Sequence, residues 1–108
     1  MVIELAAFRV HDGAEDRLVA ERPAMLAALR ARFPACLAAY LTREDDGSWL
    51  DVVVWRDRAS AEEAARLADT VPECREWFRH IASSGGPRHV TVRDAWPGEP
   101  APTGDARS

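Results

Sequence analysis

The 108-residue sequence contains no lysine, asparagine or glutamine, so all 14 of its basic residues are arginines. Alanine is abundant at the same time, and we read this bias as a result of G+C-rich codons rather than as selection for guanidinium chemistry. Acidic residues outnumber basic ones and the net charge is −4. Proteins that bind nucleic acid usually carry a basic excess on one face. The charge balance therefore argues against nucleic acid as a partner.

Cysteine and long apolar runs are also scarce. The two cysteines, Cys36 and Cys74, have no metal-like spacing and are predicted to be reduced core residues. The three histidines are scattered along the chain, so no metal site is expected. The apolar start of the chain is interrupted by Glu4 and Arg9, which argues against a signal peptide. Because no run is long enough to span a membrane, we expect a cytoplasmic protein without membrane contact.

The composition is that of a globular protein, with 47% hydrophobic and 30% charged residues. This length is sufficient for one domain with its own core. We assign residues 1–96 to that domain. The remaining segment, 97–108, reads PGEPAPTGDARS and is predicted to be a disordered tail because it is rich in Pro and Gly and lacks periodicity.

Alternation of apolar residues and turn signals predict four strands and two helices. The strands are expected at residues 2–10, 36–43, 49–56 and 88–96, and the first helix at residues 14–33. Pro23 lies inside that helix, and we expect a kink or a restart there because its ring clashes with the carbonyl four residues earlier.

Ser60 and Glu63 form a capping box that predicts the start of the second helix. This helix is expected to break near Thr70 and to restart at Pro72, since proline suits a first helical position. After the restart, an apolar stripe at helical spacing consists of Cys74, Trp77, Phe78 and Ile81. The resulting order, β-α-β-β-α-β, predicts an α+β, ferredoxin-like fold with an antiparallel sheet and both helices on one face.

The strand SWLDVVVWRD is apolar on both faces. We expect the aliphatic row Leu50, Val52 and Val54 to face the helices. The opposite row consists of Trp49, Asp51, Val53 and Trp55. It carries too much apolar surface for open water, so a second subunit or a ligand should cover it. We infer a homodimer packed sheet to sheet, with a cavity between sheet and helices or within a closed barrel.

With the strand leading into VVVWRDRASAEEA and with the later PECREWF, residues 1–96 resemble the dimeric α+β barrel proteins. Within that superfamily the chain is similar to the antibiotic biosynthesis monooxygenase group. The resemblance implies oxidation of a phenolic or polycyclic aromatic molecule by O₂ without metal, flavin or another cofactor. Members with this activity place an amide side chain and a Trp four residues apart on the third strand, and an Arg on the second helix. The matching positions here are Asp51, Trp55 and Arg75, and Asp51 departs from the family's Asn.

A second branch of the superfamily degrades haem and requires an Asn in the first strand, then a Trp and a His on the second helix. The corresponding positions hold Ala6 or Ala7, Ala64 and Cys74, and His80 is displaced from the ligand position. The resemblance therefore does not favour haem degradation.

Three readings of Asp51 remain open. Among aromatic side chains its carboxylate would be desolvated and could accept a proton from a phenol. It could also be a polar part of a cavity wall without chemistry. In the third reading it forms a buried ion pair with an arginine of a neighbouring strand, for which Arg9, Arg43 and Arg93 are candidates.

The other candidates are aromatic residues and one arginine. Trp55 offers a ring for stacking and an N–H donor, or it only fills the barrel. Arg75 would hold an anionic intermediate or lie in solvent. Four further residues are candidates for binding substrate, although each also has an ordinary structural reading: Trp49, Tyr40, Trp77 and Phe78.

Three functions are consistent with these features. The first is a homodimeric, cofactor-independent monooxygenase acting on a small aromatic molecule. The second is a non-catalytic module that binds an apolar metabolite. The third is an isomerase or cyclase-like enzyme, for which Asp51 would also serve as a proton shuttle.

Overall fold

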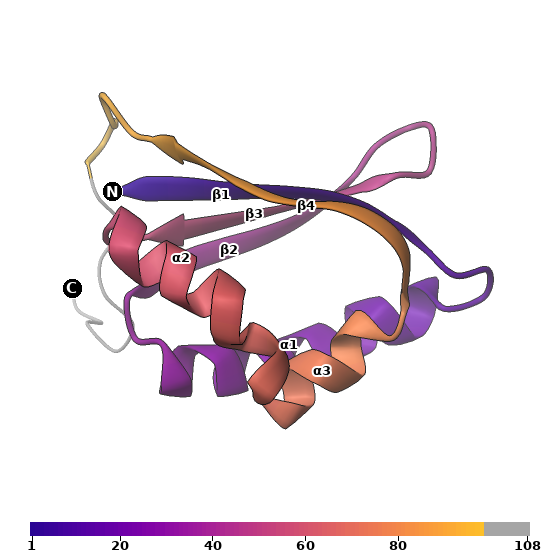
Figure 1. The fold of residues 1–108 in the computed structure, drawn as a ribbon. Helices are drawn as coiled ribbons and strands as arrows, with labels where there is room; N and C mark the ends of the chain where they lie inside the picture. Colours follow the sequence, from indigo (N-terminus) through magenta and orange to yellow (C-terminus); the bar gives the residue numbers. More distant parts are fainter. Residues whose placement is uncertain (99–108) are drawn as a thin grey trace.

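The computed structural model of the protein describes residues 1–98, and its elements follow the expected ferredoxin-like order. Four strands form one antiparallel sheet in the order β2-β3-β1-β4, and the helices cover one of its faces (Figure 1). The elements are β1 (Val2–Val10), α1 (Glu15–Arg32), β2 (Cys36–Arg43), β3 (Trp49–Trp55), α2 (Arg58–Leu67), the 3₁₀ turn η1 (Ala68–Thr70), α3 (Pro72–Phe78) and β4 (Ile81–Thr91). Most of the predicted tail, from residue 99 on, lies outside the described residues.

The expected orientation of β3 is wrong. The row Trp49, Val53 and Trp55 is buried in the core, which also contains Leu18 of α1 and Ala64 of α2. The helices therefore cover the aromatic row, and Leu50, Val52 and Val54 face the other side of the sheet. The physical reason is volume: between a sheet and helices with small residues such as alanine, there is room for large indole rings.

The fourth strand begins earlier than predicted. The Ser-Ser-Gly-Gly segment at residues 83–86, a local turn signal, belongs to β4, and Ile81 is the first residue of β4 instead of a member of the helical stripe. Pairing with β1 explains the difference, because Ser83 lies opposite Arg9 and Ser84 opposite Phe8. Long-range pairing thus outweighs the local turn signal of Ser and Gly.

Two helix predictions also need correction. The N-cap of α2 is Asp57, whose carboxylate accepts a hydrogen bond from the Ser60 backbone N–H at 2.7 Å, so Ser60 lies inside the helix. Helix α1 continues through Pro23 without ending or restarting. Leu18 before Pro23 and Met25 after it are both buried, and this packing on either side holds the helix together. No helix among the described residues is long and apolar enough to cross a membrane.

Candidate functional site

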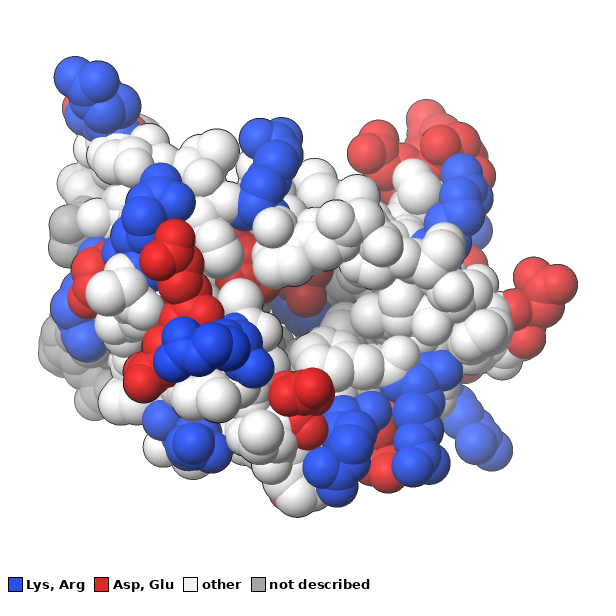
Figure 2. Space-filling model, viewed as in Figure 1, with Lys and Arg blue, Asp and Glu red and all other residues white. Residues whose placement is uncertain are grey.

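A cavity of about 540 Å³ lies between the sheet and the helices. Figure 2 shows its mouth as a hollow near the centre of this face, with charged atoms visible inside and uncharged side chains around it. Strands β1, β3 and β4 form one wall, and α1, α2, η1 and α3 form the other. Its apolar lining includes Phe8, Met25, Leu29, Trp55, Trp77 and Phe78. A space of this size and apolar character suits a small ring compound.

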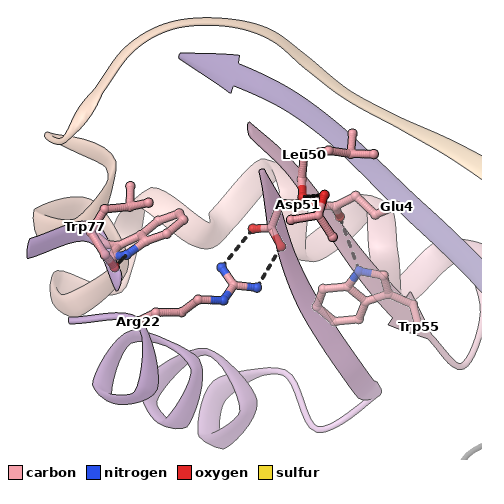
Figure 3. Close-up of polar contacts among 8 residues, drawn as sticks. Glu4, Arg22, Leu50, Asp51, Trp55 and Trp77 are labelled. Carbon is pink, nitrogen blue, oxygen red and sulfur yellow. Dashed lines mark hydrogen bonds and ion pairs between the residues drawn. The ribbon is translucent and has the colours of Figure 1, made fainter. Parts of the chain in front are cut away.

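The acidic residue at the centre of β3 is paired with an arginine of α1. The two oxygens of Asp51 accept hydrogen bonds from the two terminal nitrogens of Arg22, at 2.7 and 3.1 Å. Both side chains are largely buried, with 8% of Arg22 and 14% of Asp51 exposed. Figure 3 shows the two groups facing each other. The ion-pair reading of Asp51 thus describes its contacts, but its partner is Arg22 and not Arg9, Arg43 or Arg93.

Aromatic residues support this ion pair from the helix side. The guanidinium carbon of Arg22 lies 5.4 Å from the centre of the Trp77 ring, a cation–π distance. The Trp77 indole N–H donates to the carbonyl of Leu18 at 2.7 Å, which fixes α3 against α1. Because Arg22, Asp51 and Trp77 hold one another, the polar end of the cavity has a fixed geometry.

A second carboxylate, that of Glu4 on β1, lies in the same cavity. Its Oε1 accepts a hydrogen bond from the Trp55 indole N–H at 3.2 Å and lies 3.3 Å from His89 Nε2 (Figure 3 shows the Trp55 contact). Burial raises the pKa of Glu4 above its ordinary value. The negative charge of Asp51 adds to this increase, whereas the bonds from His89 and Trp55 oppose it. This carboxyl group is therefore easier to protonate than an exposed glutamate.

The structure brings four of the predicted site residues to the cavity and leaves three elsewhere. Asp51, Trp55, Trp77 and Phe78 line it. The other three do not. Arg75 is exposed, and its guanidinium donates to the Asp69 carbonyl at 3.4 Å. Tyr40 is 58% exposed on β2, while Trp49 is buried and stacks on Phe8 with ring centres 6.4 Å apart.

Sequence reasoning missed Arg22, Glu4 and His89. A signal for Arg22 was present, because it falls on the apolar stripe of α1, four residues after Leu18 and three before Met25. Glu4 interrupts an apolar strand just as Asp51 does. The contact with His89, 85 residues away in the chain, had no local signal.

No group of three His, Cys, Asp or Glu side chains within residues 1–98 is arranged to hold a metal ion. The two cysteines are buried and not bonded to each other, and Cys74 also lines the cavity.

Comparison with known proteins places this site in context. Residues 1–79 match the family model described as antibiotic biosynthesis monooxygenase. Among solved structures, the chain is similar to SnoaB, a cofactor-independent oxygenase from Streptomyces nogalater, with 25% identity and a TM-score of 0.67. The alignment covers 90% of this chain and 97% of SnoaB. An asparagine-to-alanine mutant of SnoaB aligns over the same shares with 24% identity and the same TM-score of 0.67.

A protein of Mycobacterium tuberculosis, Rv0793, shares the fold at 19% identity and a TM-score of 0.62, with 88% of this chain and 97% of that one covered. No protein of curated function matches the chain.

Proposed function

This chain belongs to the antibiotic biosynthesis monooxygenase family, because its residues 1–79 match the model of that family. From this premise we propose the following function. The protein binds a small phenolic or polycyclic aromatic molecule in the cavity and oxidises it with O₂, without a metal or organic cofactor. The observation that carries this proposal is the cavity of about 540 Å³, in which aromatic side chains surround two carboxylates. The similarity to SnoaB, itself a cofactor-independent oxygenase, supports the proposal.

The apolar lining favours a planar, uncharged substrate. The ring of Phe78, which is 38% exposed, provides a stacking surface on the helix side, whereas Trp55 and Trp77 are each 2% exposed and form part of the buried cavity wall. The guanidinium of Arg22 is already neutralised by Asp51, so an anionic substrate would meet no free cation there. A neutral phenol, which donates a hydrogen bond, fits the acceptors that line this space.

The reaction can be written so that its atoms and electrons balance. For an anthrone-like substrate, a ring CH₂ group and O₂ give a C=O group and H₂O. Two C–H bonds break, O₂ gains four electrons, one oxygen atom becomes the carbonyl oxygen and the other leaves as water. Loss of the phenolic proton makes the ring electron-rich enough to pass the first electron to O₂. The protein's part is to bind, orient and deprotonate the substrate.

We assign Asp51 a positioning role in this reaction. Both of its oxygens accept hydrogen bonds from Arg22, which hold the carboxylate in one orientation at the cavity wall. We assign Arg75 no contact with the substrate, because its side chain is exposed and donates a hydrogen bond to the Asp69 carbonyl.

Oxygen consumption tests the proposal directly. Purified protein is mixed with anthrone-like and hydroquinone substrates, with and without a chelator, added metal and flavin, and O₂ uptake and product are measured together. With an anthrone-like substrate we expect one O₂ consumed per carbonyl formed, unaffected by the additions. Phe78→Ala should raise KM by removing a stacking surface, whereas Val19→Ala, an exposed change on α1, serves as the control. No oxygen uptake across the panel contradicts the proposal.

One observation favours a second function, that of a non-catalytic binding protein. The bidentate pairing of Asp51 with Arg22 has the geometry of a structural element. Under this alternative, aromatic molecules quench tryptophan fluorescence and raise the melting temperature, but no product forms. An isomerase or cyclase-like reaction would instead convert the ligand without consuming O₂, so the same measurements separate all three functions.

The proposal includes a homodimer formed through the outer face of the sheet. No helix within residues 1–98 covers this face (Figure 1), and an apolar sheet face of this kind is typical of an interface. Among its side chains are the half-buried Ile3, Leu5, Leu50 and Val52 and the buried Val54. Val52→Glu should shift the protein to a monomer in sedimentation velocity, whereas Val19→Glu on the helix side should not. A monomeric wild-type protein would contradict this part of the proposal.

A further inference from the structure

The position of Glu4 gives it a role that neither the family match nor the sequence comparison assigns. We propose that Glu4 is the proton acceptor for a phenolic hydroxyl in the cavity, and that His89 positions its carboxylate. This inference rests on the proposed function, since it names the group that deprotonates the substrate there.

The two carboxylates of the cavity differ in what their oxygens contact. Both oxygens of Asp51 are bound by Arg22. Both protein contacts of Glu4 fall on Oε1, from Trp55 and His89. Among residues 1–98, no group donates a hydrogen bond to Glu4 Oε2. This oxygen is therefore available to a ligand that fills the cavity.

The sheet register explains why these groups meet. Glu4 is directly opposite His89 in the pairing of β1 with β4, and Val2, its neighbour on the same face, is opposite Trp55 of β3. Side chains that share one face of adjacent strands lie close together. Backbone pairing, not a flexible loop, thus fixes the position of the carboxylate relative to the ring of Trp55.

His89 holds the carboxylate of Glu4 in place. Strand β4 is the edge of the sheet, and the side chain of His89 is 10% exposed, less than the 17% of Glu4. Because Glu4 is the more exposed of the two, a proton that leaves the phenol can pass from Glu4 to water directly, while the imidazole fixes the position of Oε1.

The surrounding charges are consistent with an acceptor at Glu4. The charged or titratable groups that face it are His89 on β4, Asp51 on β3 with its partner Arg22, and the Cys36 thiol on β2. Asp69 of η1 lines the same cavity, and α2 contributes only alanines. Burial raises the pKa of Glu4, which brings this carboxyl group closer to the working range of a general base at neutral pH.

The proton balance of the step is simple. The phenolic O–H bond breaks, an O–H bond forms at Glu4 Oε2, and the electron pair stays on the substrate as a phenolate. When water forms later in the reaction, Glu4 returns the proton or exchanges it with solvent. No further oxidant or reductant is needed for this step.

A binding experiment tests the acceptor without requiring turnover. The probes are naphthol and its methyl ether, which have the same ring but differ in the O–H donor. A hydrogen bond to a charged acceptor contributes enough for wild-type protein to prefer naphthol by about tenfold or more. In Glu4→Leu this preference should disappear, whereas in Glu44→Leu, at an exposed turn, it should remain. Equal binding of the two probes by wild-type protein would overturn the inference.

A kinetic experiment tests the role in the reaction. With a substrate that wild-type protein oxidises, Glu4→Gln should lower kcat by about a hundredfold or more while KM changes little. His89→Ala should move the acid limb of the pH profile to higher pH, because the contact with His89 opposes the upward shift of the Glu4 pKa. An acid limb that does not move in His89→Ala would show that the group titrating in the profile is not Glu4.

The outcomes for the inference and for the proposed function are distinct. If wild-type protein consumes no oxygen but prefers naphthol through Glu4, the oxygenase proposal fails and the acceptor stands. If wild-type protein consumes oxygen and Glu4→Gln keeps kcat within a factor of a few, the proposed function stands and the inference fails. Circular dichroism of each variant checks that the fold is retained.

Discussion

Asp51 and Arg22 form a two-point ion pair across the layers of the fold, with nitrogen-to-oxygen distances of 2.7 and 3.1 Å and no more than 14% of either side chain exposed. The pair joins the centre of β3 to the middle of α1 at the inner end of the cavity. Removing one member leaves the other buried and unpaired. The free-energy cost of that unpaired charge is larger than the net stabilisation that the intact pair provides.

We therefore predict that Asp51→Leu and Arg22→Met each lower the free energy of unfolding by about 3–5 kcal/mol. The double variant should be less destabilised than the sum of the two, and even than either one alone, because no uncompensated charge remains. Urea unfolding of the four proteins measures this coupling. Additive effects would show that the pair contributes nothing specific.

A larger side chain in the cavity should prevent ligand binding without unfolding the protein. Ala68 of η1 lines the cavity and is only partly buried, so Ala68→Leu extends into the space where a ring would bind. We expect the Kd for naphthol to rise at least tenfold while the melting temperature stays within a few degrees. Ala59→Leu, on the exposed surface of α2, is the matched control. Unchanged affinity in Ala68→Leu would place the ligand elsewhere.

The raised pKa of Glu4 predicts how stability depends on pH. Its folded pKa lies above the reference value of 4.5, so the folded state binds this proton more tightly than the unfolded state. The contribution of Glu4 to stability is therefore fully present below pH 4.5 and is lost as pH rises through the folded pKa. Each unit of upward shift corresponds to about 1.4 kcal/mol.

Urea unfolding between pH 4 and pH 8 measures this effect. The stability of Glu4→Gln relative to wild-type protein should increase as pH rises, because glutamine carries no charge to bury. Glu44→Gln, at an exposed turn, should show no such trend. A constant difference between Glu4→Gln and wild-type protein across this range contradicts the assigned environment of Glu4.

The two cysteines should be unreactive in the folded protein. Burial raises the pKa of both Cys36 and Cys74 to about 11. At pH 8 only about a thousandth of each thiol is ionised, and the thiolate is the reactive form. We expect reaction with a disulfide reagent to be at least a hundredfold slower than in urea, where both thiols should react. Rapid labelling of one thiol in native protein would reveal an opening of the core around it.

The strands and turns in the first half of the chain can be predicted from the sequence. The predicted bounds of β1 and β2 agree with the structure, and β3 ends one residue earlier than predicted. These segments alternate in a two-residue period and are bounded by clear turn or proline signals. The fold class followed from the order of these elements, and the family match agrees with the resemblance carried by β3 and the helix after it.

The start of β4 and the site residues Arg22, Glu4 and His89 could not be predicted in the same way. Ser83 and Ser84 form a strand only because they pair with β1, so their conformation depends on residues about 75 positions away. Arg22 was open to detection as a charged residue on an apolar stripe. The contact between Glu4 and His89 was not, because it depends on the register of two strands distant in sequence.

The sequence by itself determined that Trp49, Asp51, Val53 and Trp55 share one face of a strand, since side chains alternate along any strand. It did not determine which way that face points, because both faces of β3 are apolar and local pattern cannot choose between them. Tertiary packing made that choice: the space beneath the helices holds the large indole rings, and only there does Asp51 find Arg22. The same packing brought Glu4 into the cavity beside it.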